Sequence, residues 1–286
     1  MKKNSYFFMF FMLVLFVSCG KTATNSETPN DTTTQIQETQ QIQNVADEIK
    51  KIEFEIFSDS GTVELVAGEE GSPAASFKEQ ILVVTEVPSQ TNLETIQAVL
   101  QKKQDYSGDA KQALAKKKKN YLEGYIEMNS EEVIGMSAEW YRDLQVSVIF
   151  NDNYFTTIAF YLDEYGGGAH PYYTTSFINL DLKNSKQIKL SDIFDENSQT
   201  KLKDKMLEKA SEIAKKEGVN SLEDYGFFVE EISPTENFAI IEKGIEFSYN
   251  RGEITPHVMP SPVFFFTWQE LESIVNTDSP IRILMK

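Results

Sequence analysis

The chain has 286 residues, with 27 basic and 44 acidic side chains that give a formal net charge of −17 at pH 7. A surface this acidic repels phosphate groups, so nucleic acid is excluded as a partner. The 20 Phe, 12 Tyr and 2 Trp residues exclude disorder over most of the length, and they predict a sizeable core in one or two domains.

The N-terminus has the pattern of a bacterial lipoprotein signal. Two lysines precede an apolar run at residues 6–17, which ends just before Cys19, the only cysteine. The run is shorter than the roughly 20 residues that cross a bilayer core. It predicts a signal peptide, residues 1–18, that is removed when Cys19 is acylated, and this removal takes the formal charge from −17 to −19. We therefore expect an envelope protein anchored to a membrane by the lipid on Cys19, in the periplasm or on the outer membrane, with surface exposure left open.

A polar segment follows the predicted anchor. Residues 19–48 are rich in Thr, Gln and Asn and poor in apolar side chains, which is typical of a flexible tether. Beyond it, the sequence predicts a smaller α/β subdomain over residues 49–136 and an α+β domain over residues 137–286.

The elements of the smaller subdomain are predicted from periodicity and turn residues. They are a strand at 52–57, a turn at Gly61, strands at 62–66 and 78–87, and helices at 93–104 and 109–123, the second capped by Asp109. Lys116, Lys117, Lys118 and Lys119 form a basic run on this second helix. The run has two interpretations, contact with an anionic envelope polymer or a solvated helix face. Four consecutive residues point around the whole helix, which favours the solvated face.

The second half predicts an α+β fold in which a largely antiparallel sheet packs against an amphipathic helix at about 196–216. In chain order the elements are a hairpin of strands 144–150 and 154–162 around a turn at 151–153, strands at 172–182 and 187–190, the helix 196–216, strands at 237–241, 244–249 and 263–267, and a final helix at 268–275. Leu202, Met206, Ala210 and Ile213 are spaced as one buried stripe of the helix.

Three segments of this half together resemble one family. They are Tyr165-Gly-Gly-Gly-Ala-His-Pro171, residues 177–194 and residues 244–271. Their order and spacing are similar to the RsiV-type extracytoplasmic domain, a domain of unknown function found in a lysozyme-binding anti-sigma factor and in some peptidoglycan deacetylases. The resemblance implies an envelope-facing binding module for lysozyme, another cationic protein, or peptidoglycan. The resemblance does not imply a signalling role, because a lipoprotein signal stands in place of a membrane-spanning helix. It does not imply deacetylase activity either, because the metal-binding motifs are absent.

The glycine-rich loop is the candidate ligand-contact site. Its residues are Tyr165, Gly166, Gly167, Gly168, His170, Tyr172 and Tyr173. Glycines permit positive φ and close backbone approach, and tyrosines offer aromatic contact surface. The alternative interpretation is a purely structural turn between two strands.

Two other functions remain open at this point. An envelope hydrolase would use His170 as a base with Asp163 or Glu164 nearby, and a structural envelope lipoprotein would have no ligand. His170 and His257 are the only histidines, without the second spaced ligand set that a zinc site requires. The sequence therefore predicts no catalytic residue, no metal and no cofactor, and a protein that is not an enzyme.

Overall fold

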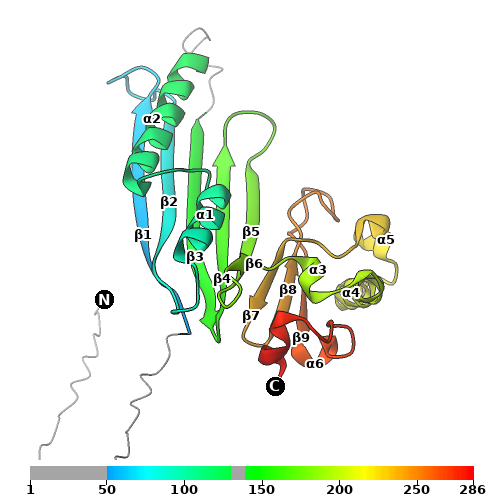
Figure 1. The fold of residues 1–286 in the computed structure, drawn as a ribbon. Helices are drawn as coiled ribbons and strands as arrows, with labels where there is room; N and C mark the ends of the chain where they lie inside the picture. Colours follow the sequence, from blue (N-terminus) through cyan, green and yellow to red (C-terminus); the bar gives the residue numbers. More distant parts are fainter. Residues whose placement is uncertain (1–49, 130–138) are drawn as a thin grey trace, which may run out of the picture. The chain divides into compact units, whose positions relative to one another are not determined.

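The computed structural model describes residues 50–129 and 139–286, so the predicted signal peptide, Cys19 and the tether lie outside the described residues. Residues Ala46–Lys286 belong to one compact unit. The unit holds a six-stranded sheet in the order β1-β2-β3-β4-β5-β6 and a three-stranded sheet in the order β7-β8-β9 (Figure 1). The predicted α+β class is confirmed. No helix in the described part of the chain is long and apolar enough to span a membrane.

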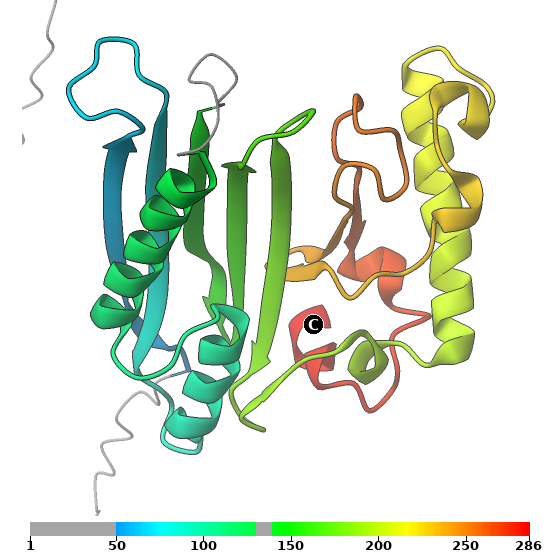
Figure 2. The ribbon, with the colours of Figure 1, turned by 90° about the horizontal axis from the view of Figure 1, so that it is seen from above.

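The six-stranded sheet is antiparallel except between β2 and β3. Its strands are β1 (Glu53–Glu64), β2 (Ala74–Glu86), β3 (Trp140–Asp152), β4 (Phe155–Tyr165), β5 (Tyr172–Asp181) and β6 (Lys186–Gln187). A parallel pair needs a long crossover connection. Here α1 (Leu93–Lys103) and α2 (Ala110–Asn129) belong to that crossover, and both lie on the same face of the sheet (Figures 1 and 2). One sheet thus includes strands from both sides of residue 136, the boundary predicted between the smaller subdomain and the α+β domain.

The predicted turn at Gly61 is wrong, because β1 runs straight through this residue. Gly61 pairs with Phe77 of β2 inside a regular antiparallel ladder. A Cβ at Gly61 would lie 3.1 Å from Cδ of Lys118 and 3.4 Å from Cδ1 of Leu122, both on α2. The glycine therefore lets the helix approach the strand closely, which is a different use of the same residue.

Glutamine side chains fill the seam where β2 and β3 separate. The parallel pairing of β2 ends at Glu79. Beyond it, Leu82 donates its N–H to Oε1 of Gln104 (2.7 Å), and Nε2 of Gln104 donates to the Leu82 carbonyl (2.9 Å). Gln97 accepts from the N–H of Val84 at 3.2 Å. These amides satisfy backbone groups that would otherwise lack partners in the interior.

The predicted hairpin is confirmed, although its turn lies slightly later in the chain. Asp152 pairs with Phe155, so the turn consists of Asn153 and Tyr154. Both residues have positive φ, 51° and 68°, as a tight two-residue hairpin turn requires. Tyr154 is held there because its N–H donates to Lys50 and its carbonyl accepts from Leu182, each at 2.9 Å.

The long helix packs against the second sheet. α4 (Glu196–Lys216) has the predicted bounds, and Leu202, Met206 and Ala210 are fully buried against phenylalanines of β8 and β9. At the end of the stripe Ala214 is buried and Ile213 only half-buried. The remaining elements are α3 (Leu190–Ile193), α5 (Leu222–Tyr225), η2 (Val229–Glu231), β7 (Phe238–Ile241), β8 (Gly244–Ser248), β9 (Val263–Thr267), α6 (Trp268–Leu271) and η3 (Pro280–Met285), so the predicted final helix is shorter than expected.

Asn179 joins the two sheets through buried hydrogen bonds. Its Nδ2 donates to the Phe238 carbonyl (2.8 Å), and its Oδ1 accepts from the Ile240 N–H (2.9 Å) and from Oγ1 of Thr157 (2.9 Å). Ala159 and Phe177 pack against Ala239 in the same region. Because side chains alternate along a strand, this contact lies on the face of β4 and β5 opposite α1.

Candidate functional site

The glycine-rich loop closes the hairpin between β4 and β5. Tyr165 is the last residue of β4, and its hydroxyl donates to the Gly168 carbonyl at 2.8 Å. Gly167 and Gly168 have φ of 86° and 106°, which only glycine adopts readily. A Cβ at Gly166 would meet nothing within 4 Å, so that position does not require glycine.

His170 brings this loop against a second one. Its ring lies 4.9 Å, centroid to centroid, from the ring of His257 at an interplanar angle of 33°. His257 belongs to the connection between β8 and β9, residues 249–262. Gly252 has φ of +84°, and a Cβ there would lie 2.5 Å from Nε2 of His257. The sequence drew attention to both histidines, but nothing in it indicated that they touch.

Two more contacts join the 249–262 connection to β5. The guanidinium of Arg251 lies 4.8 Å from the ring centroid of Tyr173. The N–H of Thr175 donates to Oδ1 of Asn250 at 2.8 Å. We call residues 165–173 and 249–262 the paired loops. Tyr172, the first residue of β5, is 53% exposed beside them, and Val258 is 91% exposed.

A small acidic cavity lies beside the paired loops, on the sheet face that also carries Tyr173. Its volume is about 260 Å³, and Asp143, Asp163, Tyr161 and Tyr173 are among its lining residues. Asp143, Asp163 and Tyr173 lie directly opposite one another on β3, β4 and β5. Lys78 donates to Asp143 at 2.8 Å. One buried oxygen each of Asp143 and Asp163 has no hydrogen-bond partner among the described residues.

Two tyrosines on this sheet face, Tyr141 and Tyr161, have raised pKa values. Burial raises the pKa of Tyr141, and the neighbouring Tyr173 hydroxyl and Asp163 carboxylate raise it further. Burial also raises the pKa of Tyr161, with a smaller contribution from the charge of Glu246.

The residues considered for hydrolysis occupy separate positions. Asp163 and Glu164 point to opposite faces of β4. Glu164 binds Arg142, which also binds the buried Glu79. Nδ1 of His170 lies 3.1 Å from the Pro171 carbonyl, and its ring contacts His257 rather than either carboxylate. Across residues 50–129 and 139–286, no group of three or more His, Cys, Asp and Glu side chains is placed to hold a metal ion.

Comparisons with known proteins concern the domain and the fold. A crystal structure of a DUF3298-family member from Bacteroides fragilis is similar, with a TM-score of 0.67 and 24% identity, over 82% of this chain and 97% of that one. A DUF3298-family structure from Pseudomonas aeruginosa is also similar, with a TM-score of 0.57 and 18% identity, over 79% of this chain and 95% of that one. No curated protein matches the chain.

A family model locates this likeness in the sequence. Residues 191–269 match the family described as "Protein of unknown function (DUF3298)". The matched segment contains α4 and the three-stranded sheet, and it includes His257 but not the glycine-rich loop. The resemblance to the RsiV-type family stays a prediction. Residues 191–269 thus match the DUF3298 family model, and the fold is similar to that of solved structures of DUF3298-family members.

Proposed function

We propose that this chain is a non-enzymatic binding module of the bacterial envelope, anchored through a lipid on Cys19, whose paired loops bind a cationic protein such as lysozyme. The observation that carries the proposal is the pair of loops itself. The tilted rings of His170 and His257 lie in contact between two exposed segments, and Tyr172 and Val258 are exposed on these segments. Exposed aromatic side chains on a rigid support are favourable anchors for a protein partner.

Charge supports a cationic partner. The whole chain has a formal charge of −17, which accelerates the encounter with a basic protein. Asp143 and Asp163 line the nearby cavity together with Tyr161 and Tyr173. Carboxylates and aromatic rings are the groups that bind Lys and Arg side chains, by ion pairing and cation–π contact.

The binding test uses the compact unit, Ala46–Lys286, which contains every hydrophobic cluster that the structure describes. Titration with hen lysozyme in a calorimeter should give saturable binding that weakens as salt increases, because screening reduces charge attraction. Tyr172→Ala and His170→Ala should each weaken binding about tenfold or more, as anchor residues do.

The matched control is Leu93→Ala, which truncates an exposed apolar side chain at the start of α1. This variant should bind lysozyme normally. Equal loss in the control and in Tyr172→Ala would contradict a site at the paired loops. Absence of lysozyme binding together with binding of peptidoglycan fragments would identify a cell-wall component as the ligand instead.

The hydrolase alternative is tested in the same samples. Peptidoglycan fragments incubated with the unit should remain intact by mass spectrometry. Turnover that His170→Ala abolishes would replace the binding proposal with a hydrolase. Protease accessibility on intact cells would separately test the predicted envelope location, and a structural lipoprotein would show neither binding nor turnover.

A further inference from the structure

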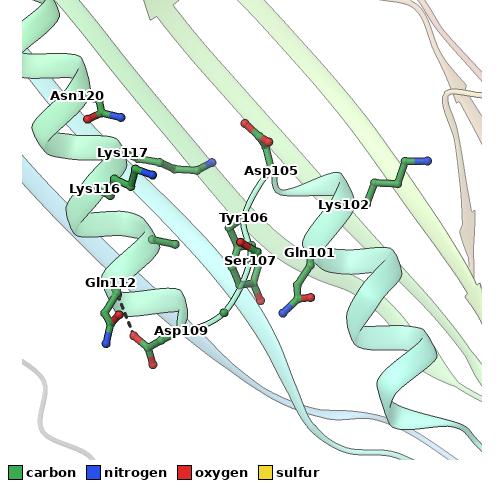
Figure 3. Close-up of a pocket in the computed structure, with 12 residues that line it drawn as sticks. Gln101, Lys102, Asp105, Tyr106, Ser107, Asp109, Gln112, Lys116, Lys117 and Asn120 are labelled. Atoms are coloured by element: carbon green, nitrogen blue, oxygen red, sulfur yellow. Dashed lines mark hydrogen bonds between the residues drawn. The ribbon is translucent and has the colours of Figure 1, made fainter.

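A second cavity lies between α1 and α2, away from the paired loops. Its volume is about 700 Å³, within the range of about 300–1,000 Å³ common for ligand sites. Figure 3 shows that its lining comes from both helices and from the connection between them. Most of the lining is polar, namely Gln101, Lys102, Asp105, Ser107, Asp109, Gln112, Lys116, Lys117 and Asn120.

Only two of the four lysines in the basic run line this cavity. Lys118 binds Asp59 at 2.6 Å, and Lys119 lies 3.8 Å from Glu123, so both are neutralised outside it. Lys116 and Lys117 line the cavity instead. The four lysines therefore have different surroundings: Lys118 and Lys119 are ion-paired outside the cavity, whereas Lys116 and Lys117 line it, and Lys117 also pairs with Glu79.

Lys117 is held in place by the protein interior. Its Nζ donates to the Gln104 carbonyl at 2.8 Å and lies 3.6 Å from Oε2 of Glu79. Glu79 is 2% exposed, and the same carboxylate also binds Arg142. A lysine fixed in this way loses little side-chain entropy when it binds a ligand, unlike a mobile surface lysine.

The balance of charge in the cavity is opposite to that of the molecule. Lys102, Lys116 and Lys117 stand against Asp105 and Asp109. Asp109 caps α2, because its Oδ1 accepts the N–H of Gln112 at 2.9 Å, and Lys117 is paired with Glu79. The lining thus has one more lysine than aspartates, whereas the whole chain has an excess of acidic residues, so an anion is repelled less here than over most of the surface.

The remaining lining suits a ligand with hydroxyl groups. Gln101, Gln112 and Asn120 offer amide donors and acceptors around the opening (Figure 3). The half-buried Tyr106 contributes an aromatic ring, whose hydroxyl accepts from Nε2 of Gln97 at 2.7 Å. Amides bind hydroxyls, an aromatic ring covers the apolar face of a sugar, and ammonium groups bind an acid.

We propose that this cavity binds an anionic saccharide, a sugar that carries a carboxylate or a phosphate group. The site uses α1 and α2, whereas the paired loops use β4, β5 and the β8–β9 connection. It therefore extends the proposed binding function without depending on lysozyme as the partner.

The test is a titration of the unit Ala46–Lys286 followed by NMR of the Gln and Asn side-chain amides. The probes are N-acetylmuramic acid, N-acetylglucosamine 1-phosphate, neutral N-acetylglucosamine and inorganic phosphate. At least one acidic sugar should shift the signals of Gln101 and Asn120 saturably, at about tenfold lower concentration than the neutral sugar or phosphate alone. The tighter of the two acidic sugars identifies a carboxylate or a phosphate as the acid group.

Three results would overturn the proposal. Equal binding of the neutral sugar would remove the role of charge, equal binding of inorganic phosphate would indicate an adventitious ion only, and no response would indicate no site.

Lys116→Gln should weaken binding of the acidic sugar about threefold to tenfold. Lys119→Gln makes the same change of charge on the same helix outside the cavity and should leave affinity unchanged, so equal weakening by both variants would also count against the site.

Lys117→Met provides a second comparison, with circular dichroism to check folding, since it removes a partner of the buried Glu79. A folded Lys117→Met that binds the acidic sugar normally would contradict the assigned role of Lys117. Lysozyme binding of Lys116→Gln should equal that of the unaltered unit. The saccharide site and the paired loops can therefore fail independently.

Discussion

Thr267 and Glu270 close the start of α6 through reciprocal hydrogen bonds. Thr267 donates its N–H to Oε2 of Glu270 at 2.8 Å, and Glu270 donates its N–H to Oγ1 of Thr267 at 3.3 Å. Lys209 of α4 binds the same carboxylate at 2.8 Å. Burial alone would raise the pKa of Glu270, but the bonds from Lys209 and Thr267 outweigh it and lower this pKa to about 2. One carboxylate thus joins the cap of α6 to α4.

This geometry predicts a pH-dependent contribution to stability. A depressed pKa means that the ionised carboxylate stabilises the fold above the ordinary value of 4.5, and that this stabilisation is lost as pH falls toward about 2. Glu270→Gln should lower the free energy of unfolding at pH 7 by about 1 kcal/mol or less, because the carboxylate is partly exposed. Urea unfolding at pH 7 and pH 3 measures the difference. A difference that does not shrink at the lower pH would contradict the assigned charge effect.

At the level of elements, the seam between β2 and β3 depends on α1. Gln104 is the C-cap residue of α1, it is 4% exposed, and its amide bonds both backbone groups of Leu82. The Gln104 side chain thereby makes the hydrogen bonds that a neighbouring strand would make where the parallel ladder ends. The helix and the strand are coupled by this amide as well as by apolar packing.

Gln104→Ala should open the seam. It leaves the N–H and the carbonyl of Leu82 without partners in the interior, at a cost of about 1–3 kcal/mol for each unsatisfied group. Hydrogen exchange should show faster exchange of the Leu82 amide than in the unaltered unit. Gln90→Ala, in an exposed loop, is the control and should leave exchange unchanged. Unchanged protection of Leu82 in Gln104→Ala would show that water or another group satisfies the seam.

Elements with strong local patterns could be predicted, and contacts between distant residues could not. The apolar spacing of α4 predicts the helix because Leu202, Met206, Ala210 and Ala214 form one buried stripe. Gly61 was misread because a glycine in a strand signals a turn as readily as it signals the approach of a helix. The seam glutamines and the contact of His170 with His257 join residues far apart in the chain, so no local pattern contains them. The glycine-rich loop remains a predicted site.

At the scale of the whole molecule, buried polar contacts join the two sheets, and Asn179 makes several of them. Asn179 is 3% exposed and bonds backbone groups at Phe238 and Ile240 of β7. An amide that pairs with strand backbone fixes the position of one sheet on the other more strictly than apolar packing does, because hydrogen bonds are directional.

Asn179→Ala should therefore weaken the contact between the two sheets. It removes the partners of the Phe238 carbonyl and the Ile240 N–H, and we expect a loss of about 2–5 kcal/mol in the free energy of unfolding. Urea unfolding followed by fluorescence and by circular dichroism measures this loss. Asn197→Ala, exposed in the first turn of α4, should change stability by about 0.5 kcal/mol or less. Equal stability of the two variants would show that the hydrogen bonds of Asn179 do not contribute to joining the sheets.

The parallel pairing of β2 with β3 also governs the order in which the chain can fold. Lys78 and Asp143 form an ion pair across this ladder although they are 65 residues apart. Synthesis proceeds from the N-terminus, so β1 and β2 are complete while β3 has yet to emerge, and one edge of β2 meanwhile has no neighbouring strand. An unpaired edge invites association with other chains. Nascent α1 and α2, which emerge next and cover a face of this hairpin, are its earliest protection before the sheet is finished.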